Sequence, residues 1–206
     1  MQFVFDLFLF MIWLYAISRG IVTAFRQRER LRWSTAGMWL LVLIGFGGFF
    51  GTIFAAEGYL KLPSSFEWPA GYAAGVVRMP NGDHVVPLAN AARLQIYNAD
   101  WKFLRGWHVS AGGGDFTVEC SDGRALEVYT ARGNHHYTFT EEGELLASAN
   151  YDKQFGLPHR DASHVVVPTS PFGWIFSSPA ISWGIGVLGF IGLGLIKKFA
   201  NRASAG

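Results

Sequence analysis

The residue types best suited to chemistry in this sequence are six histidines, which all lie between residues 84 and 164. His159, Asp161 and His164 fall close together in a stretch without strand or helix pattern, and imidazole and carboxylate groups are common zinc ligands. His135 and His136 are neighbours in a strand-like run, where adjacent side chains point to opposite faces, so they are not expected to share a metal ion. Because the segment around His159 is otherwise an ordinary polar loop, we keep its three residues only as weak metal candidates. A metal-dependent enzyme is an unfavoured alternative.

Nucleophilic catalysis needs an activated serine or cysteine beside a base, and the sequence shows no such pattern. It has no Gly-x-Ser-x-Gly segment, and its one cysteine, Cys120, lies in the strand-like run DFTVEC. A single cysteine also excludes an internal disulfide, a c-type haem attachment motif and a thiolate zinc cluster. We therefore expect no catalytic residues, no enzyme activity and no cofactor of the chain's own.

The apolar residues are concentrated in three stretches, in a chain that is 50% hydrophobic and 16% charged. A helix needs about 20 mainly apolar residues to span a bilayer. Residues 1–25, 36–58 and 171–197 meet this requirement and are predicted to be three transmembrane helices. None of them contains a histidine, which excludes imidazole ligation of haem or chlorin within the membrane. Their scarcity of ionisable groups argues against a stand-alone transporter.

The positions of lysine and arginine predict the orientation, because these residues concentrate in cytoplasmic loops. Residues 26–35 carry four arginines and one acid, and the tail 198–206 carries two basic residues and no acid. Residues 57–171 instead hold nine Lys or Arg and thirteen Asp or Glu, a net charge of −4. We predict a multi-pass protein of a bacterial inner membrane, with the N-terminus and residues 76–170 in the periplasm and the C-terminus in the cytoplasm. The total net charge of +2 gives no reason to expect nucleic acid as a partner.

Two sets of residues in and beside the helices indicate contacts. Small residues at four-residue spacing let helix backbones approach closely in a membrane, either within one chain or against a neighbouring subunit. Arginines beside a membrane bind anionic headgroups or an acidic partner, although topology alone also explains such a run. The predicted helix-packing residues are Gly47, Gly51, Ala55, Ser178, Ser182 and Gly186, and the predicted lipid-contact or acidic-partner residues are Arg26, Arg28, Arg30 and Arg32.

Beyond the second apolar stretch the pattern changes to a connector and then to strands. Residues 59–75 are rich in Pro, Gly and aromatic residues and predict an extended connector near the membrane surface, with Tyr59, Phe66, Trp68 and Tyr72 as interfacial anchors. Residues 76–170 consist of short β-type runs separated by turns with Asn-Gly and Asp-Gly pairs, which indicate hairpins. The runs are VVRM, HVVPL, RLQIYN, KFLRGWHVS, DFTVEC, ALEVYT, HYTFT and ELLASA. The predicted fold class is a membrane protein with three transmembrane α-helices and a small antiparallel all-β extracytoplasmic domain.

Residues 93–104 echo residues 135–146 with an offset of 42, the spacing of repeated blades. Residues 121–148 have an Asp-Gly turn, the triplet Gly133-Asn134-His135 and a closing Gly143-to-Leu146 segment, and they resemble an NHL-type β-propeller repeat. In the earlier copy, Asn90-Ala91-Ala92 replaces the triplet and Trp101 replaces the turn glycine.

The resemblance covers about seventy residues, or about one and a half blades. A closed propeller needs at least four. It therefore implies an open set of blade-like hairpins, used for binding rather than chemistry, whose edges another element must cover.

These observations together favour a non-catalytic accessory or scaffold subunit of a larger inner-membrane complex, such as a respiratory, photosynthetic or translocation complex. Its expected partners are other membrane subunits and membrane lipids. Quinone or pigment contacts are expected only through partner subunits. The alternative is a stand-alone membrane-anchored sensor or ligand-binding protein.

Overall fold

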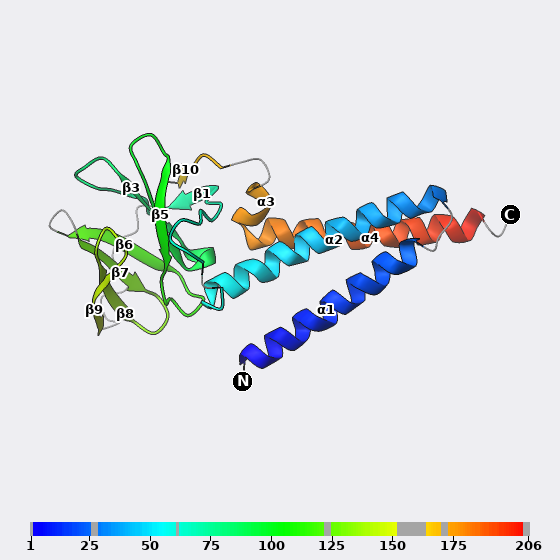
Figure 1. Cartoon of the computed structure of the whole chain (residues 1–206), viewed down its shortest axis with the longest axis horizontal. Coiled ribbons are helices and arrows are strands. Elements are labelled where there is room, and N and C mark those ends of the chain that lie inside the picture. Colours follow the sequence, from blue (N-terminus) through cyan, green and yellow to red (C-terminus); the bar gives the residue numbers. More distant parts are fainter. Residues whose placement is uncertain are drawn as a thin grey trace. The chain divides into compact units, whose positions relative to one another are not determined.

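The computed structural model describes residues 2–25, 29–60, 62–121, 125–151, 164–169 and 173–203 and divides into two compact units (Figure 1). We call Met1–Phe50 together with Pro179–Gly206 the helical unit, and Gly51–Ser178 the β unit. His159, Asp161, Arg26 and Arg28, which the sequence singled out, lie outside the described residues.

The helical unit contains three long helices, α1 (Gln2–Phe25), α2 (Glu29–Ala56) and α4 (Pro179–Ala203), and the last six residues of α2 belong to the β unit. Segments Trp33–Ala56 of α2 and Pro179–Arg202 of α4 are long and apolar enough to cross a membrane. The apolar segment of α1, Phe10–Ala24, is shorter. Two of the three predicted spans therefore have helices of the required length and composition, whereas membrane crossing by α1 stays a prediction.

Two element boundaries differ from the sequence-based expectation. α2 begins at Glu29, so residues 29–35 of the expected basic loop are helical. The expected third span is divided, because the short helix α3 (Trp174–Ser177) is followed by the extended residue Ser178 before α4 starts at Pro179. Proline suits the first position of a helix, where its missing N–H would have no helical partner.

Glycines bring α2 and α4 into close contact. A Cβ atom on Gly45 would overlap the backbone of Gly186, and one on Gly189 would lie 2.7 Å from Cγ2 of Val42. Val42 and Ser182 are fully buried in this contact region. Close backbone approach of this kind stabilises helix pairs that have no hydrophobic effect between them.

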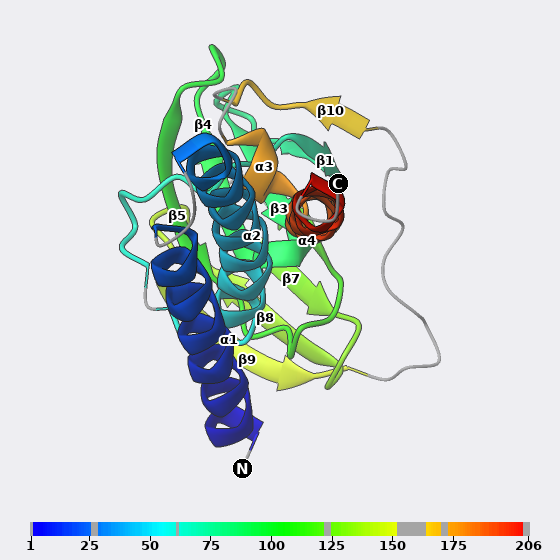
Figure 2. The same cartoon turned by 90° about the vertical axis from the view of Figure 1, so that its right-hand side faces the viewer.

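Among the described residues, the β unit contains two four-stranded antiparallel meanders and one two-stranded pair. The first meander has the order β2-β3-β4-β5, and the second has the order β6-β7-β8-β9. β1 pairs with β10, and the two strands lie side by side in Figure 2. The sheets are built of hairpins and are not closed, as the sequence predicted. The strands are β1 (Tyr72–Ala74), β2 (Val77–Arg78), β3 (His84–Leu88), β4 (Arg93–Tyr97), β5 (Phe103–His108), β6 (Phe116–Ser121), β7 (Ala125–Thr130), β8 (His135–Phe139), β9 (Leu145–Asn150) and β10 (His164–Val166).

The main hydrophobic core is formed by residues from both meanders, including Leu94, Ile96, Phe116 and Leu126. A second cluster uses the alternate residues of the first meander together with the connector, and it includes Tyr97 and Trp68. Trp68 is only 9% exposed, so the expectation that it anchors the chain at a membrane surface is wrong. The first meander is therefore covered on both faces.

Three hairpin turns in the meanders share one geometry. In each turn the first N–H donates to the carbonyl four residues later: Met79 to Asp83, Asn98 to Lys102 and Thr140 to Glu144, at 2.8 to 2.9 Å. The residue three positions after the first has a positive φ, and these residues are Gly82, Trp101 and Gly143. This is the three-residue hairpin loop that places its last residue in the left-handed region.

The sequence echo corresponds to a structural repeat. Trp101 and Gly143, which occupy the same turn position, are separated by the offset of the sequence echo. The strand registers shift between Ile96 and Tyr97 in the first meander and between Thr138 and Phe139 in the second, again at that offset. The two meanders are therefore equivalent in these hairpins.

Candidate functional site

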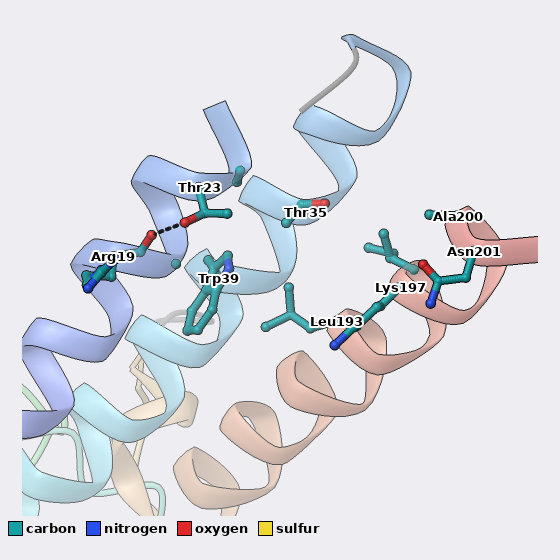
Figure 3. A pocket seen from close by; sticks show the side chains of 11 residues that line it. Arg19, Thr23, Thr35, Trp39, Leu193, Lys197, Ala200 and Asn201 are labelled. Carbon is teal, nitrogen blue, oxygen red and sulfur yellow. Dashed lines mark hydrogen bonds between the residues drawn. The ribbon is translucent and has the colours of Figure 1, made fainter. Parts of the chain in front are cut away.

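A pocket of about 590 Å³ lies between α1, α2 and α4 within the helical unit (Figure 3). Its lining includes Arg19 from α1, Trp39 from α2 and Lys197 from α4. The Trp39 ring packs directly on Gly20, where a Cβ atom would overlap it, and meets Phe190 edge to face at 6.1 Å. The pocket lining therefore includes two cationic residues and the Trp39 indole, which these packing contacts hold in position.

In the β unit, β4 presents three buried polar side chains, Arg93, Gln95 and Tyr97, on the face opposite the main core. They are two residues apart, so they share one side of the strand. The Gln95 side chain accepts from the Trp68 N–H at 2.6 Å and donates to the Trp68 carbonyl at 3.0 Å and to the Tyr97 hydroxyl at 2.7 Å. The Tyr97 hydroxyl donates to the Glu67 carboxylate at 3.1 Å. We call Arg93, Gln95 and Tyr97 the polar ladder. Its hydrogen bonds hold the connector against the sheet.

Arg93 is the charged member of the polar ladder. Its Nη2 donates to the carbonyls of Pro63, Phe66 and Gly106 at 2.8 to 2.9 Å, while its Nε is buried without a hydrogen-bond partner. Burial lowers the pKa of Arg93 from its ordinary value. A buried guanidinium held by backbone carbonyls fixes the surrounding chain but leaves little room for a ligand.

Other groups near the ladder have shifted pKa values. Burial, followed by the charge of Glu67, raises the pKa of Tyr97, which keeps its hydroxyl a donor. Partial burial and the neighbouring Arg93 guanidinium lower the pKa of His108, its cross-strand neighbour in β5. These shifts follow from the packing of the connector and indicate a structural role for the ladder.

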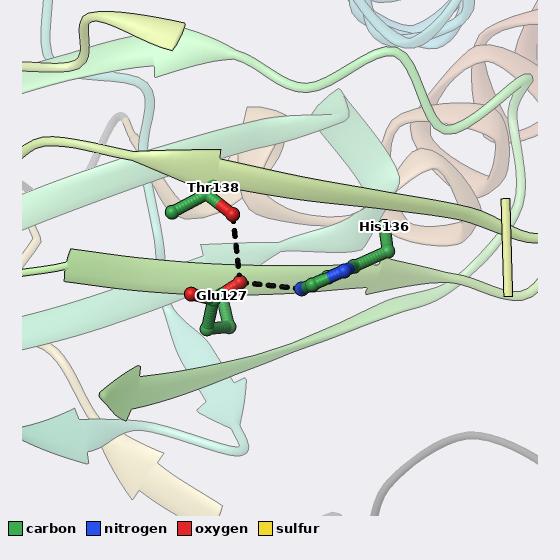
Figure 4. A network of polar contacts seen from close by, with 3 residues as sticks. All are labelled: Glu127, His136 and Thr138. Atoms are coloured by element: carbon green, nitrogen blue, oxygen red, sulfur yellow. Dashed lines mark hydrogen bonds and ion pairs between the residues drawn. The ribbon is translucent and has the colours of Figure 1, made fainter. Parts of the chain in front are cut away.

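The second meander carries a polar cluster on its outer face (Figure 4). The ring of His136 contacts the Glu127 carboxylate and stacks on Tyr129 with a centroid distance of 4.4 Å. The Thr138 hydroxyl donates to the same Glu127 oxygen at 2.9 Å. Because Thr138 gives its proton to Glu127 and not to His136, the arrangement differs from the hydroxyl–imidazole pair that nucleophilic catalysis requires.

Among the strands that the structure describes, the end strand β9 is the most exposed. Each of its six residues is exposed, with Leu145 at 54% and Leu146 at 61%, and none of them is charged. Among the described strands, β9 pairs only with β8. A pocket of about 750 Å³ lies beside its start and is lined by Leu146, Glu141 and Glu142, among others. β9 therefore offers a long, uncharged edge next to an acidic pocket.

The structure distributes the predicted helix-packing residues among different surroundings. Ser182 and Gly186 lie at the α2–α4 contact. A Cβ atom on Gly47 would lie 3.7 Å from the ring of Trp13 in α1, whereas a Cβ atom on Gly51 would meet no other part of the protein within 4 Å beyond its own helix backbone. Ala55 is buried in the second cluster, and Ser178 follows α3.

The other predicted site residues are only partly placed. Arg30 and Arg32 lie in the first turn and a half of α2. His164 is exposed in β10. Within the described part of the chain, no three His, Cys, Asp or Glu side chains gather as metal ligands would.

Sequence reasoning missed the polar ladder and the pocket of the helical unit. The ladder has no local signal, because its partners are backbone groups of the connector. The pocket did have one, since Arg19 interrupts an apolar stretch and Lys197 ends another. None of the protein-family models, curated proteins and solved structures compared with the chain matches it.

Proposed function

We propose that this chain is a non-catalytic accessory subunit of a larger bacterial inner-membrane complex, and that β9 is the strand to which another subunit adds. The observation that carries the proposal is the exposed, uncharged edge of β9. An exposed edge strand presents unpaired N–H and C=O groups and is a template for pairing with another chain. Main-chain hydrogen bonds to an added strand are a recurrent mode of protein recognition.

The other three end strands of the two meanders are protected in different ways. β2 has only two residues. In β5, the Gly106 N–H already donates to the Ser64 carbonyl of the connector at 2.9 Å. β6 lies against β2 and β3, and its first three residues are buried. Among the described end strands, β9 alone combines length, exposure and lack of charge. Natural sheets usually blunt such an edge with Lys, Pro or a bulge. β9 contains no Lys or Pro, and its one irregularity is the register shift at Leu146, near its start.

The membrane anchor supports the same proposal. α4 exposes many large apolar side chains, among them Leu188 and Phe199 at 62% each, which would be unfavourable in water and suit lipid or a second membrane subunit. We further propose that α1 is a third span, that the β unit lies in the periplasm as the charge distribution predicts, and that its two meanders are blade-like units of the NHL type. The β unit would then present β9 to a partner outside the cytoplasm.

The direction of the unpaired groups in β9 defines a sharp test. The Tyr151 N–H donates to the carbonyl of Asn134, the residue just before β8, so it points towards β8. Along an antiparallel strand the backbone N–H groups point alternately towards and away from the paired strand. The Ser148 N–H, three residues before Tyr151, therefore points away from β8. Proline at Ser148 therefore removes an outward donor and leaves the β8–β9 bonds intact. Ser148→Ala is the matched control, because it keeps the N–H.

The experiment is purification of the tagged full-length chain from native membranes in mild detergent, followed by identification of the proteins that accompany it. We expect the wild-type chain and Ser148→Ala to retain the same partner subunit in stoichiometric amount, and Ser148→Pro to lose it while its circular dichroism spectrum is unchanged. A monodisperse wild-type chain without accompanying protein contradicts the proposal. So does full retention of the partner by Ser148→Pro.

A further inference from the structure

We propose that the small sheet of β1 and β10, together with α3, lies in the headgroup region of the bilayer and fixes the β unit at the membrane surface. Its lipid-contacting side chains are Tyr72, Val166 and Trp174. The sequence predicts Tyr72 as an anchor of an extended connector, but it does not predict β10 or a sheet at this place. The inference rests on the membrane anchoring proposed above and is independent of the role of β9.

The β unit contains residues that lie directly at the ends of both apolar helices. Gly51–Ala56, the last six residues of the apolar segment of α2, belong to this unit. α3 belongs to it as well, and only Ser178 separates α3 from the apolar helix α4. With α2 and α4 across the membrane, these two places lie at the same surface of the bilayer, because the β unit connects them.

β1 packs against both of these places. Ala55 at the end of α2 and Ala73 of β1 are buried in the same hydrophobic cluster. A Cβ atom on Gly71, the residue before β1, would overlap α3. The Tyr72 ring meets the Trp174 ring of α3 edge to face, with a centroid distance of 5.1 Å. In both Figure 1 and Figure 2, α3 lies beside β1. β1 is therefore held next to the residues that enter the membrane.

The exposed face of the sheet suits the membrane interface. Tyr72 and Val166 are directly paired across β1 and β10, so their side chains lie on one face. They are 64% and 56% exposed. The other two residues on this face, Ala74 and His164, bring no carboxylate. Tyrosine and tryptophan are enriched where a membrane meets water, since their rings have an apolar body and a polar edge.

The length of α3 matches the depth of the headgroup region. α3 is apolar in its first three residues, Trp174–Phe176, and none of its residues is buried. One turn of four residues advances about 6 Å, and the headgroup region is about 5–8 Å deep on each side of the hydrocarbon. Among the described strands, β10 pairs only with β1. Water in the headgroup region can satisfy the outer backbone groups of β10, which the hydrocarbon could not.

The test is the accessibility of nitroxide spin labels on the purified full-length chain in phosphatidylcholine vesicles. The variants are Tyr72→Cys, Val166→Cys, Leu146→Cys and Leu188→Cys, each in a Cys120→Ala background that removes the one natural cysteine. Oxygen is enriched in the bilayer and a nickel chelate stays in water, so the ratio of their collision rates rises with depth. Leu146 in β9 is the matched control at 61% exposed, and Leu188 at 62% marks the α4 span.

We expect the oxygen-to-nickel ratio to be highest in Leu188→Cys and lowest in Leu146→Cys. The ratios in Tyr72→Cys and Val166→Cys should lie between these two values. Val166→Cys leaves the contact between Tyr72 and Trp174 in place, so it reports on the bilayer even where a label at Tyr72 displaces the Trp174 ring. The vesicles contain no partner subunit, so only lipid can lower the access of nickel at the sheet.

Three results would overturn the inference. Ratios in Tyr72→Cys and Val166→Cys as low as that in Leu146→Cys, with a high ratio in Leu188→Cys, would refute the seat of the sheet and leave the membrane anchor intact. A ratio in Leu146→Cys as high as theirs would show unspecific contact of the β unit with lipid. A low ratio in Leu188→Cys would refute the membrane anchor itself, and this inference with it.

Discussion

Replacing Gln95 by leucine should loosen the connector from the β unit more than any other conservative change on β4. Gln95 is fully buried, and its side chain satisfies both the N–H and the carbonyl of Trp68. Leucine has a similar volume but no polar atoms. Both Trp68 backbone groups would then stay buried without a partner. The Tyr97 hydroxyl would also lose the hydrogen bond that it accepts from Gln95.

The magnitude follows from the number of orphaned groups. Each buried polar group left without a partner costs about 1–3 kcal/mol, so the two Trp68 groups together cost about 2–6 kcal/mol. The lower value alone corresponds to an opening equilibrium about 30-fold more favourable. This is a large share of the stability of a small domain, which is about 5–15 kcal/mol.

Hydrogen exchange of the full-length chain in detergent, read by mass spectrometry, measures this effect. We expect Gln95→Leu to accelerate exchange in the peptides that cover residues 62–74 by at least about 30-fold, in line with the lower estimate. Thr138→Val is the control, because it removes one hydrogen bond from the outer face of the second meander and should leave those peptides unchanged. Unaltered exchange at residues 62–74 in Gln95→Leu would refute the role assigned to the polar ladder.

Three further predictions concern helix packing, a turn and pH. Gly186→Val should separate α2 from α4, because the new side chain would collide with the ring of Phe46. Gly184→Val is the control, because a side chain there meets open space. We expect Gly186→Val to have the lower melting temperature in detergent. Gly143→Ala should destabilise the β8–β9 hairpin by about 1–2 kcal/mol, since its φ of +89° disfavours a side chain and the new methyl group meets the Trp107 ring; an unchanged urea midpoint would contradict this. Because the pKa of His108 is lowered in the folded chain, the unfolded chain binds a proton at this residue at a higher pH than the folded chain does. The free energy of unfolding should therefore fall as the pH drops below about 6.5 towards the folded-state pKa. Urea titrations between pH 7.5 and 5 should show a smaller fall for His108→Gln than for the wild-type chain, and an equal fall in both would count against this reasoning.

Much of the β unit could be predicted because its signals are local. The eight expected strand runs are the strands β2 to β9, since alternation of apolar residues and turn pairs such as Asn81-Gly82 act over a few residues. The 42-residue echo likewise identified equivalent hairpins. Even Trp101, which departs from the turn glycine, keeps the left-handed backbone, and its ring stacks on His84 at 4.1 Å. That contact offsets part of the cost of the unusual conformation.

The features that sequence reasoning missed depend on contacts between distant segments. β1 and β10 are three residues each and pair across about ninety residues, too short and too far apart for a periodic signal. In β4, alternation alone would place Gln95 towards water. It is buried only because the connector folds over that face, so burial of Gln95 and of Trp68 had no local sign. The sequence predicted that another element must cover the open edges of the hairpins, but it did not identify β9 as the exposed strand.

The most direct test of the central claim is site-specific photo-crosslinking in native membranes. A benzophenone amino acid is placed at Ser148 in β9 or, as the control, at Glu119, which is exposed in β6 of the same meander. The account predicts that Ser148 yields a crosslinked product with one defined second polypeptide and that Glu119 does not. The absence of any such product at Ser148, or equal products at both positions, would contradict the assignment of β9 as a docking strand.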